Sequence, residues 1–176
     1  MDTITFEGKT YRRRNKKWTD LNGEVVHEIL QSKLNTAFLL TLDPESMSVE
    51  ELIQNGDKFK GSNAISAAIR FYERASQCAD QQELAGILPR MTSCYRMQGE
   101  PQKAIDILTF ASEKYGPVMI TPALLTSAAA AYCDLGKYSL AVKCCNRAFA
   151  KSGGKASGEL NAVYGRIRKE SNELDS

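Results

Sequence analysis

Apolar and small residues recur at helical spacing along most of the chain, and glycine or proline interrupts the pattern at regular intervals. Two segments, TSCYRMQGEPQKAIDIL and AAYCDLGKYSLAV, present an aromatic residue, a glycine and an alanine in the same order. These residues are Tyr95, Gly99 and Ala104 in the first segment and, at a constant offset of 37 (132 − 95), Tyr132, Gly136 and Ala141 in the second. Self-similarity at a fixed period indicates that the chain is built from repeats.

A third copy of the pattern lies upstream. Counted from the aromatic residue, each copy has leucine seven residues before it, a small residue three before it, and alanine, a bulky residue and alanine nine, thirteen and sixteen after it. The three copies are Leu52, Gly56, Phe59, Ala68, Tyr72 and Ala75; Leu88, Thr92, Tyr95, Ala104, Leu108 and Ala111; and Leu125, Ala129, Tyr132, Ala141, Cys145 and Ala148. Because helices approach closely only where facing side chains are small, the pattern predicts three antiparallel helix pairs.

This spacing of small and large positions resembles that of the tetratricopeptide repeat (TPR) family over roughly residues 49–151. The resemblance implies a mainly α fold with three helix-turn-helix units in a right-handed superhelical array, whose first helices line a concave groove that docks peptides. The period is 36 and then 37 residues (95 − 59, 132 − 95), slightly longer than the ~34 residues of the family. We therefore expect a few extra residues in the connections between repeats.

Local signals predict where the helices begin and end. The expected N-caps are Ser48 and Asp80, each with a glutamate three residues later, and Thr121, which precedes a proline. Gly99 and Gly136 should end the first helices of the second and third pairs, since glycine tolerates the left-handed backbone found there. Pro89 contradicts the pattern, and we expect it to kink or restart its helix.

The C-terminal segment after Gly153 and Gly154 predicts a capping helix. Its apolar stripe at helical spacing consists of Leu160, Val163, Tyr164 and Ile167. The charged residues expected on the remaining, water-facing side are Glu159, Arg166, Lys169 and Glu170. A last helix of this kind covers the exposed apolar end of a repeat array.

The N-terminal residues 1–26 alternate apolar and polar positions and resemble no family known to us. Turn residues at 7–8, 20–23 and, more weakly, 15–16 predict a small β-hairpin or meander of three or four strands. Such a sheet is marginal alone, so we expect it to pack on a helix over residues 27–40. The apolar face expected for this helix consists of Ile29, Leu30, Leu34, Ala37 and Phe38. Pro44 then predicts a boundary between one unit at residues 1–44 and a repeat domain at residues 45–176.

Composition narrows the class of protein. The chain has 176 residues, 43% hydrophobic and 25% charged, which is ordinary for a soluble protein. No apolar run approaches the ~20 residues that span a bilayer, and the N-terminus lacks the apolar core of a signal peptide. We therefore expect a cytoplasmic protein with no membrane partner. A net charge of +2 does not indicate a polyanion partner for the whole chain.

Candidate catalytic groups are few. Five cysteines without CxxC spacing predict reduced, mostly buried thiols and no metal or other cofactor; Cys145 occupies a bulky repeat position, and Cys144 should be more exposed. His27 is the sole histidine and is expected to be an ordinary surface residue. The sequence GKT at residues 8–10 lacks the glycine that a phosphate-binding loop needs at Thr3. These observations argue against an enzyme.

A basic run, YRRRNKKW, is the sharpest local feature. Five cations between Tyr11 and Trp18 suggest an alternative function, nucleic-acid binding through residues 12–17, with phosphate contacts and a ring stacked on a base. The simpler interpretation is a solvated hairpin in which side chains alternate between faces. Nearby acids would then neutralise much of the charge; they are Asp2, Glu7, Asp20, Glu24 and Glu28.

The repeat register predicts which residues line the groove. They are Glu50, Ile53, Gln54 and Asp57 from the first pair, Pro89, Arg90, Ser93 and Arg96 from the second, and Ala123, Thr126, Ser127 and Ala130 from the third. We therefore predict a non-catalytic scaffold that binds a protein or peptide segment, with Arg90 either contacting the partner or pairing with Asp57. The family's clamp for chaperone C-terminal carboxylates uses Lys, Asn, Asn, Lys and Arg. None agrees with the matching Ile53, Asp57, Arg90, Ala123 and Ser127, so that partner is not expected.

Overall fold

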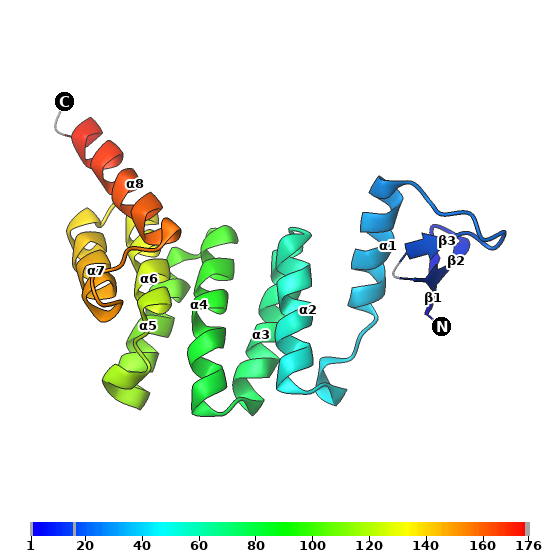
Figure 1. Ribbon diagram of the computed structural model, residues 1–176, viewed down its shortest axis with the longest axis horizontal. Helices are drawn as coiled ribbons and strands as arrows, with labels where there is room; N and C mark the ends of the chain where they lie inside the picture. The colour runs from blue at the N-terminus through cyan, green and yellow to red at the C-terminus, as the bar shows by residue number, and fades with distance from the viewer. Residues whose placement is uncertain (1, 16, 175–176) are drawn as a thin grey trace.

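The computed structural model describes residues 2–15 and 17–174, which form a small sheet and a row of helices (Figure 1). The strands are β1 (Thr3–Phe6), β2 (Lys9–Arg14) and β3 (Lys17–Thr19). The α-helices are α1 (Glu28–Leu40), α2 (Val49–Gly61), α3 (Ile65–Cys78), α4 (Gln81–Met97), α5 (Pro101–Tyr115), α6 (Pro122–Asp134), α7 (Tyr138–Lys151) and α8 (Gly158–Leu174). Two short 3-10 helices, η1 (Pro44–Ser46) and η2 (Gly116–Val118), lie in connections. The sheet and α1 occupy one end of the row and α8 the other (Figure 1).

The three predicted helix pairs are α2 with α3, α4 with α5, and α6 with α7, which confirms the mainly α repeat fold. All nine small repeat positions are buried: Gly56, Ala68, Ala75, Thr92, Ala104, Ala111, Ala129, Ala141 and Ala148. Helices α2 and α3 are in close contact at Gly56, where an added Cβ would lie 2.5 Å from Cε1 of Tyr72. The small positions therefore let the paired helices meet, as the sequence predicts.

The predicted helix ends are also observed. Ser48 and Asp80 form complete capping boxes with the glutamates three residues on, and the hydroxyl of Thr121 caps α6. Gly99 and Gly136 follow α4 and α6 with positive φ angles of 81° and 68°. The corresponding residue of the first pair is Asn63, with φ of 60°. Asparagine is one of the few residues besides glycine that visits this region.

Pro89 does not restart its helix, so that part of the expectation is wrong. α4 runs without interruption over 17 residues and has Pro89 in its interior. Leu88 and Met91 on either side are buried in the core. Packing on both flanks of the proline therefore holds the helix together where the local sequence alone would end it.

The extra residues expected between repeats are found in one connection. Residues 116–121 join α5 to α6, whereas only residues 79–80 join α3 to α4. The longer connection contains η2, and it buries Met119 and Ile120. This connection therefore supplies side chains to the core.

The C-terminal helix α8 packs on both α7 and α6. Leu160, Val163 and Ile167 are buried, which confirms the predicted apolar stripe. Arg166 is not on the water-facing side as expected, because it binds Asp134 at the end of α6. α8 thus covers the end of the array and is tied to the third pair by charge.

The N-terminal strands form an antiparallel sheet in the order β1-β2-β3, with Thr3 opposite Arg12 and Arg12 opposite Thr19. In place of a fourth strand there is a single bridge between Thr19 and Val25. The turn at Glu7 and Gly8 is as predicted, with positive φ angles of 49° and 76°. The turn at 15–16 falls partly outside the described residues.

Trp18 joins this sheet to α1. The ring is fully buried, and its Nε1 donates to Oδ1 of Asn35 at 2.8 Å. The Gln31 amide accepts from the backbone N–H of Trp18 and donates to its carbonyl, so a helix side chain pairs with β3. Leu34 is buried as predicted, but Ile29 is 69% exposed, contrary to expectation. Because the sheet covers only one side of α1, Ile29 lies outside the contact that buries Leu34. The division of the chain at residue 44 stays a prediction.

The thiols are mostly buried, as predicted. Cys94, Cys133, Cys144 and Cys145 are buried, and Cys78 is exposed. Cys144 is the slightly more exposed member of its pair, as predicted, at 6% against 0% for Cys145, but both are buried because both sides of α7 face the core. Burial raises the pKa of Cys145 to about 11 and also raises that of Cys144. Both thiols therefore stay protonated at neutral pH.

Candidate functional site

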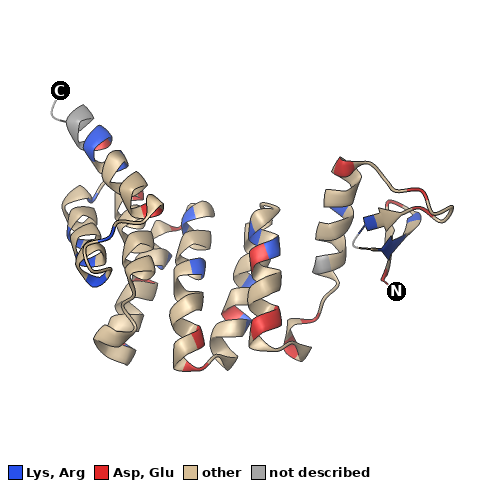
Figure 2. Ribbon diagram, viewed as in Figure 1, with Lys and Arg blue, Asp and Glu red and all other residues tan. Residues whose placement is uncertain are grey.

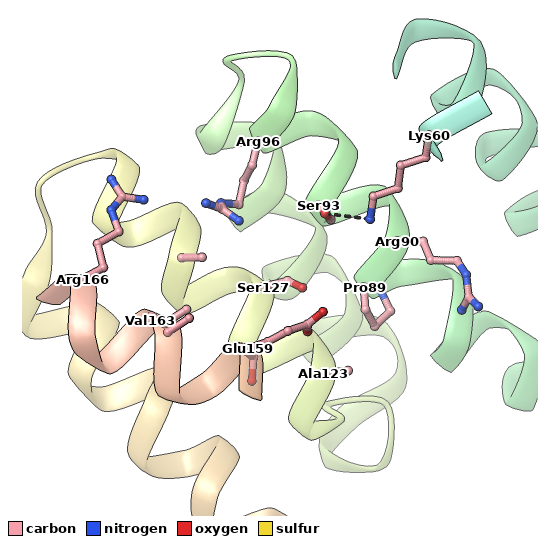
Figure 3. A pocket seen from close by; sticks show the side chains of 13 residues that line it. Lys60, Pro89, Arg90, Ser93, Arg96, Ala123, Ser127, Glu159, Val163 and Arg166 are labelled. Atoms are coloured by element: carbon pink, nitrogen blue, oxygen red, sulfur yellow. Dashed lines mark hydrogen bonds between the residues drawn. The ribbon is translucent and has the colours of Figure 1, made fainter. Parts of the chain in front are cut away.

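The inner faces of α2, α4, α6 and α8 surround a hollow of about 450 Å³, which we call the concave hollow (Figure 3). Six of the nine residues predicted for partner binding line it: Arg90, Ser93, Arg96, Thr126, Ser127 and Ala130. Pro89 and Ala123 lie beside them. The repeat register thus places the inner faces of α4 and α6 correctly.

The residues predicted from the first pair do not line this hollow. Ile53 is half-buried and packs against the core. The amide of Gln54 donates to Oε1 of Glu50 at 3.0 Å, along the surface of α2. Asp57 accepts hydrogen bonds from the Tyr72 hydroxyl at 2.6 Å and from Nε of Arg90 at 3.0 Å. Asp57 is therefore engaged in joining three helices.

Further lining residues escaped the sequence analysis. Lys60 contributes from α2, and it lies 36 residues before Arg96 (96 − 60), so the repeat offset was a usable signal. Glu159, Ala162, Val163 and Arg166 contribute from α8, which acts as a fourth inner helix. No repeat signature marks α8, so its part in the hollow depends on how it packs on α6 and α7.

One carboxylate connects three of the surrounding helices. Asp134 accepts hydrogen bonds from Nε of Arg96 at 2.6 Å and from Nη1 of Arg166. Nε of Arg166 also donates to Glu170 at 2.6 Å. Burial raises the pKa of Asp134, but the hydrogen bonds and positive charges of the two arginines outweigh it and hold that pKa below its usual value. Arg96 and Arg166 are thus neutralised by Asp134 and Glu170.

Arg90 forms the ion pair with Asp57 that the sequence left as one of two options. Its Nη1 also donates to the carbonyl of Gly86 at 2.8 Å. In Figure 3 its guanidinium points away from Ser127 and Glu159. Arg90 therefore stands at the rim of the hollow with part of its hydrogen-bonding capacity already used.

Two charges at the hollow have no ion-pair partner among the described residues. Nζ of Lys60 donates to the hydroxyl of Ser93 at 3.0 Å. Glu159 reaches from α8 toward Pro89 on the other side (Figure 3). A ligand in the hollow thus meets an ammonium group on one side and a carboxylate on the other.

The lining of the hollow consists of small, hydroxyl-bearing, aliphatic and charged side chains. Its described lining includes neither histidine nor cysteine. No three described His, Cys, Asp or Glu side chains are grouped so that they could hold a metal ion. His27 is exposed, directly precedes α1 and does not line the hollow. Its Nδ1 accepts a hydrogen bond from the backbone N–H of Leu30 at 3.4 Å.

Lysine and arginine colour much of the small sheet (Figure 2). The register of the strands divides the basic run between the two faces of the sheet. Arg12 and Arg14 are exposed on one face, and no described residue forms an ion pair with them. Arg13 lies on the other face, with its guanidinium 5.8 Å from both the Trp18 and the Phe38 ring centroids. The expected neutralisation by acids is limited here to Asp2, 3.8 Å from Arg13. Tyr11 and Trp18 are buried, so neither ring can stack on a base as the alternative function assumed.

Comparison with known proteins identifies the fold. The Sgt2 TPR domain from Aspergillus fumigatus is similar in structure, with a TM-score of 0.62 and 16% identity over 72% of this chain and 81% of that domain. MamA has a TM-score of 0.49 and 17% identity over 86% of this chain and 100% of its own. No known family model and no curated protein sequence matches the chain. None of the described helices is long and apolar enough to cross a bilayer. Through its three helix pairs, the chain has the fold of the tetratricopeptide repeat family.

Proposed function

We propose that this protein is a non-catalytic interaction scaffold that binds an extended segment of a partner protein in the concave hollow. The observation that carries the proposal is the hollow itself, which has the volume of a ligand site. On the α6 side of the hollow the side chains of Ala123, Ser127 and Ala130 are short, so a peptide backbone can lie close to the helix. The TPR fold supports the same function, because stacked first helices form a peptide-docking groove in this family.

The unpaired charges define the chemistry of the partner segment. A carboxylate of the segment would approach Lys60, and a cationic or N–H donor group would approach Glu159. The hydroxyls of Ser93 and Ser127 are available for the backbone of the segment. Recognition of this kind differs from the family's clamp, whose charged residues are all cationic, since one side of the hollow is acidic.

Site-specific photo-crosslinking in cells tests the proposal. A photoreactive amino acid at Ser127, inside the hollow, should crosslink to a partner protein, while the same amino acid at the exposed Ser139 on α7 should not. Ser127→Trp should then fill the hollow and weaken binding of the captured partner at least tenfold. Equal crosslinking from both positions, or unchanged affinity of Ser127→Trp, would show that the partner binds elsewhere.

Nucleic-acid binding is a second candidate function, and the exposed face of the sheet is the observation that favours it. Arg12, Arg14 and Lys17 share this face, all three are exposed, and none has an ion-pair partner among the described residues. Without an exposed aromatic ring on this face, the proposed contacts are to backbone phosphates only. Such binding would be independent of sequence and strongly dependent on salt.

A further inference from the structure

The outer side of the repeats carries a second open site, between α3 and α5 with α4 as its floor. We call it the α3–α5 furrow, and its volume is about 610 Å³. Leu84, Leu88 and Met91 on α4 form its apolar floor. The wall on the α5 side includes Ile107, Phe110 and Lys114. None of these residues lines the concave hollow. The furrow is therefore a separate surface.

An aromatic ring, that of Phe110, is exposed to solvent in this furrow. Phe110 is 47% exposed and meets Tyr115 edge-on, with ring centroids 5.9 Å apart. Ile107 beside it is only half-buried. An exposed ring and aliphatic side chain above an apolar floor form the kind of concave apolar surface that binds other proteins.

A lysine at the same wall has no negative partner. Nζ of Lys114 lies 5.1 Å from the Phe110 ring centroid and 5.2 Å from that of Tyr115. It forms no ion pair with any residue in the described part of the chain. At the other end of the furrow, Lys103 lies over Tyr95 and is paired with Glu100. Lys114 is thus the cation without an ion pair that a ligand would meet, and Asp106, eight residues before it on α5, is an acid of the same lining whose carboxylate accepts from the Gln102 amide.

The next furrow, between α5 and α7, shows what the same surface looks like when it is occupied. Lys151 is the repeat counterpart of Lys114 (151 − 114 = 37), and its Nζ donates to the carbonyl of Pro117 at 3.0 Å. Ile120, from the same connection, is buried against this furrow, whose remaining space is about 240 Å³. Residues 116–121 therefore supply a carbonyl oxygen to the lysine and an aliphatic side chain to the lining, in which Arg147 stands at the repeat position of Phe110 (147 − 110 = 37).

The first furrow has no such filling. The repeat counterparts of Met119 and Ile120 are Gln82 and Glu83, which are polar and exposed in the first turn of α4. The Glu83 carboxylate accepts a hydrogen bond from the backbone N–H of Asp80 in the capping box. It therefore forms no ion pair with Lys114. The lysine and the aromatic ring are left for another molecule.

We propose that the α3–α5 furrow binds a short extended segment of a partner protein, which places a large aliphatic side chain on Phe110 and a carboxylate at Lys114. The segment would act as the connection at residues 116–121 acts in the neighbouring furrow. We prefer a carboxylate of the segment to a backbone carbonyl as the group that binds Lys114, because this lysine is exposed and has no ion pair among the described residues. From Lys103 to Lys114 the wall is ~16 Å long at 1.5 Å per helical residue, which accommodates about five extended residues.

Selection of peptides from a phage-displayed library of random linear peptides on the full chain tests this site. The selected peptides should share a large aliphatic residue close to Asp or Glu. Their affinity should fall at least tenfold with Phe110→Ser and with Lys114→Glu. The matched control is Lys151→Glu in the occupied furrow, which should leave peptide affinity unchanged, as should Ser127→Trp in the concave hollow.

A charge exchange separates recognition from folding. Replacing the peptide's acidic residue by lysine should abolish binding to the wild-type chain and restore binding to Lys114→Glu, provided that the variant melts at the wild-type temperature. The proposal is overturned if no peptide is selected, if the selected peptides carry no shared acid, if Lys114→Glu binds them as tightly as the wild type, or if only Ser127→Trp weakens them. The last outcome would instead support the concave hollow.

Discussion

Nε of Arg96 on α4 lies 2.6 Å from Oδ2 of Asp134, the last residue of α6, and the same carboxylate binds Arg166 of α8. A single acidic side chain thus connects the second repeat, the third repeat and the terminal helix. Because Arg96 and Arg166 both line the concave hollow, Asp134 also sets how their charges are presented there.

Replacing Asp134 should destabilise the fold. In Asp134→Ala two partly buried guanidinium groups lose their shared acceptor, and we expect the free energy of unfolding to fall by about 1 kcal/mol. Urea denaturation measures the change. Asp106→Ala on α5 is the control, because the Asp106 carboxylate accepts only from the Gln102 side chain at the surface. Equal effects of the two substitutions would mean that the network contributes nothing measurable.

The same network predicts a pH dependence. Burial raises the pKa of Asp134, but the hydrogen bonds and charges of Arg96 and Arg166 lower it further, to a value below the ordinary 3.8. A carboxyl whose pKa is depressed on folding contributes stability above its unfolded pKa and loses it as pH falls through the folded pKa. The stability difference between wild type and Asp134→Asn should therefore be constant from pH 7 to about pH 5 and shrink below about pH 4. A difference that grew on acidification would contradict this assignment.

The helix contact at Gly56 predicts opposite effects for two glycine substitutions. In Gly56→Ala the new methyl group would overlap the buried Tyr72 ring, whose hydroxyl is held by Asp57 at 2.6 Å. Overpacking of this kind typically costs ~1–3 kcal/mol. Gly165→Ala in α8 meets nothing within 4 Å, and it should gain up to ~1 kcal/mol from helix propensity. Thermal unfolding distinguishes the two, and a stabilising Gly56→Ala would show that α2 and α3 are not in close contact there.

The helix pairs were predictable because their cause is local and repeated. Each small residue, such as Gly56 or Ala104, is required by the close approach of its own pair, so the sequence records it at a fixed spacing. The N-caps follow from side chains that bond the next turn of the same helix. Interactions over this range leave a direct mark on the sequence.

The parts that were not predictable depend on distant residues. Arg166 meets Asp134 across 32 residues, and no local pattern indicates this pair. The repeat register did bring Arg90 near Asp57, 33 residues away, but left open whether the two side chains pair. The role of α8 as a fourth inner helix likewise follows from packing on α6 and α7. Ile29 was assigned to the wrong side of α1 because helical periodicity does not say how wide a contact the sheet makes.

The two arginines of α4 should separate stability from partner binding. Arg96→Ala removes a ligand of Asp134 and should lower the free energy of unfolding by on the order of 1 kcal/mol. Arg90 is more exposed and stands at the rim, so Arg90→Ala should leave the unfolding midpoint nearly unchanged. If Arg90 contacts a partner captured through the concave hollow, its loss should weaken binding about tenfold, ~1.4 kcal/mol, as measured by titration calorimetry. Unchanged affinity would remove Arg90 from the binding surface and leave it as the ion-pair partner of Asp57.

The described part of the basic run should likewise divide into a structural cation and three exposed ones. Arg13→Ser removes a guanidinium group held against the Trp18 and Phe38 rings, so it should lower the melting temperature through a loss of ~0.5–1 kcal/mol. Arg12→Ser and Arg14→Ser are matched controls on the opposite face, and they should leave the melting temperature unchanged.

Serine at Arg12, Arg14 and Lys17 together removes the exposed cationic face without touching the buried one. If this face binds phosphates, three contacts give a slope of about −2.7 in the logarithm of affinity against the logarithm of salt concentration. Binding of a labelled DNA duplex, followed by fluorescence anisotropy, should then weaken about 40-fold between about 50 and about 200 mM salt. The threefold variant should lose both the binding and the salt dependence while melting like the wild type. Duplex affinity that is absent at low salt, or that survives the threefold substitution, would leave the concave hollow and the α3–α5 furrow as the surfaces to which partners bind.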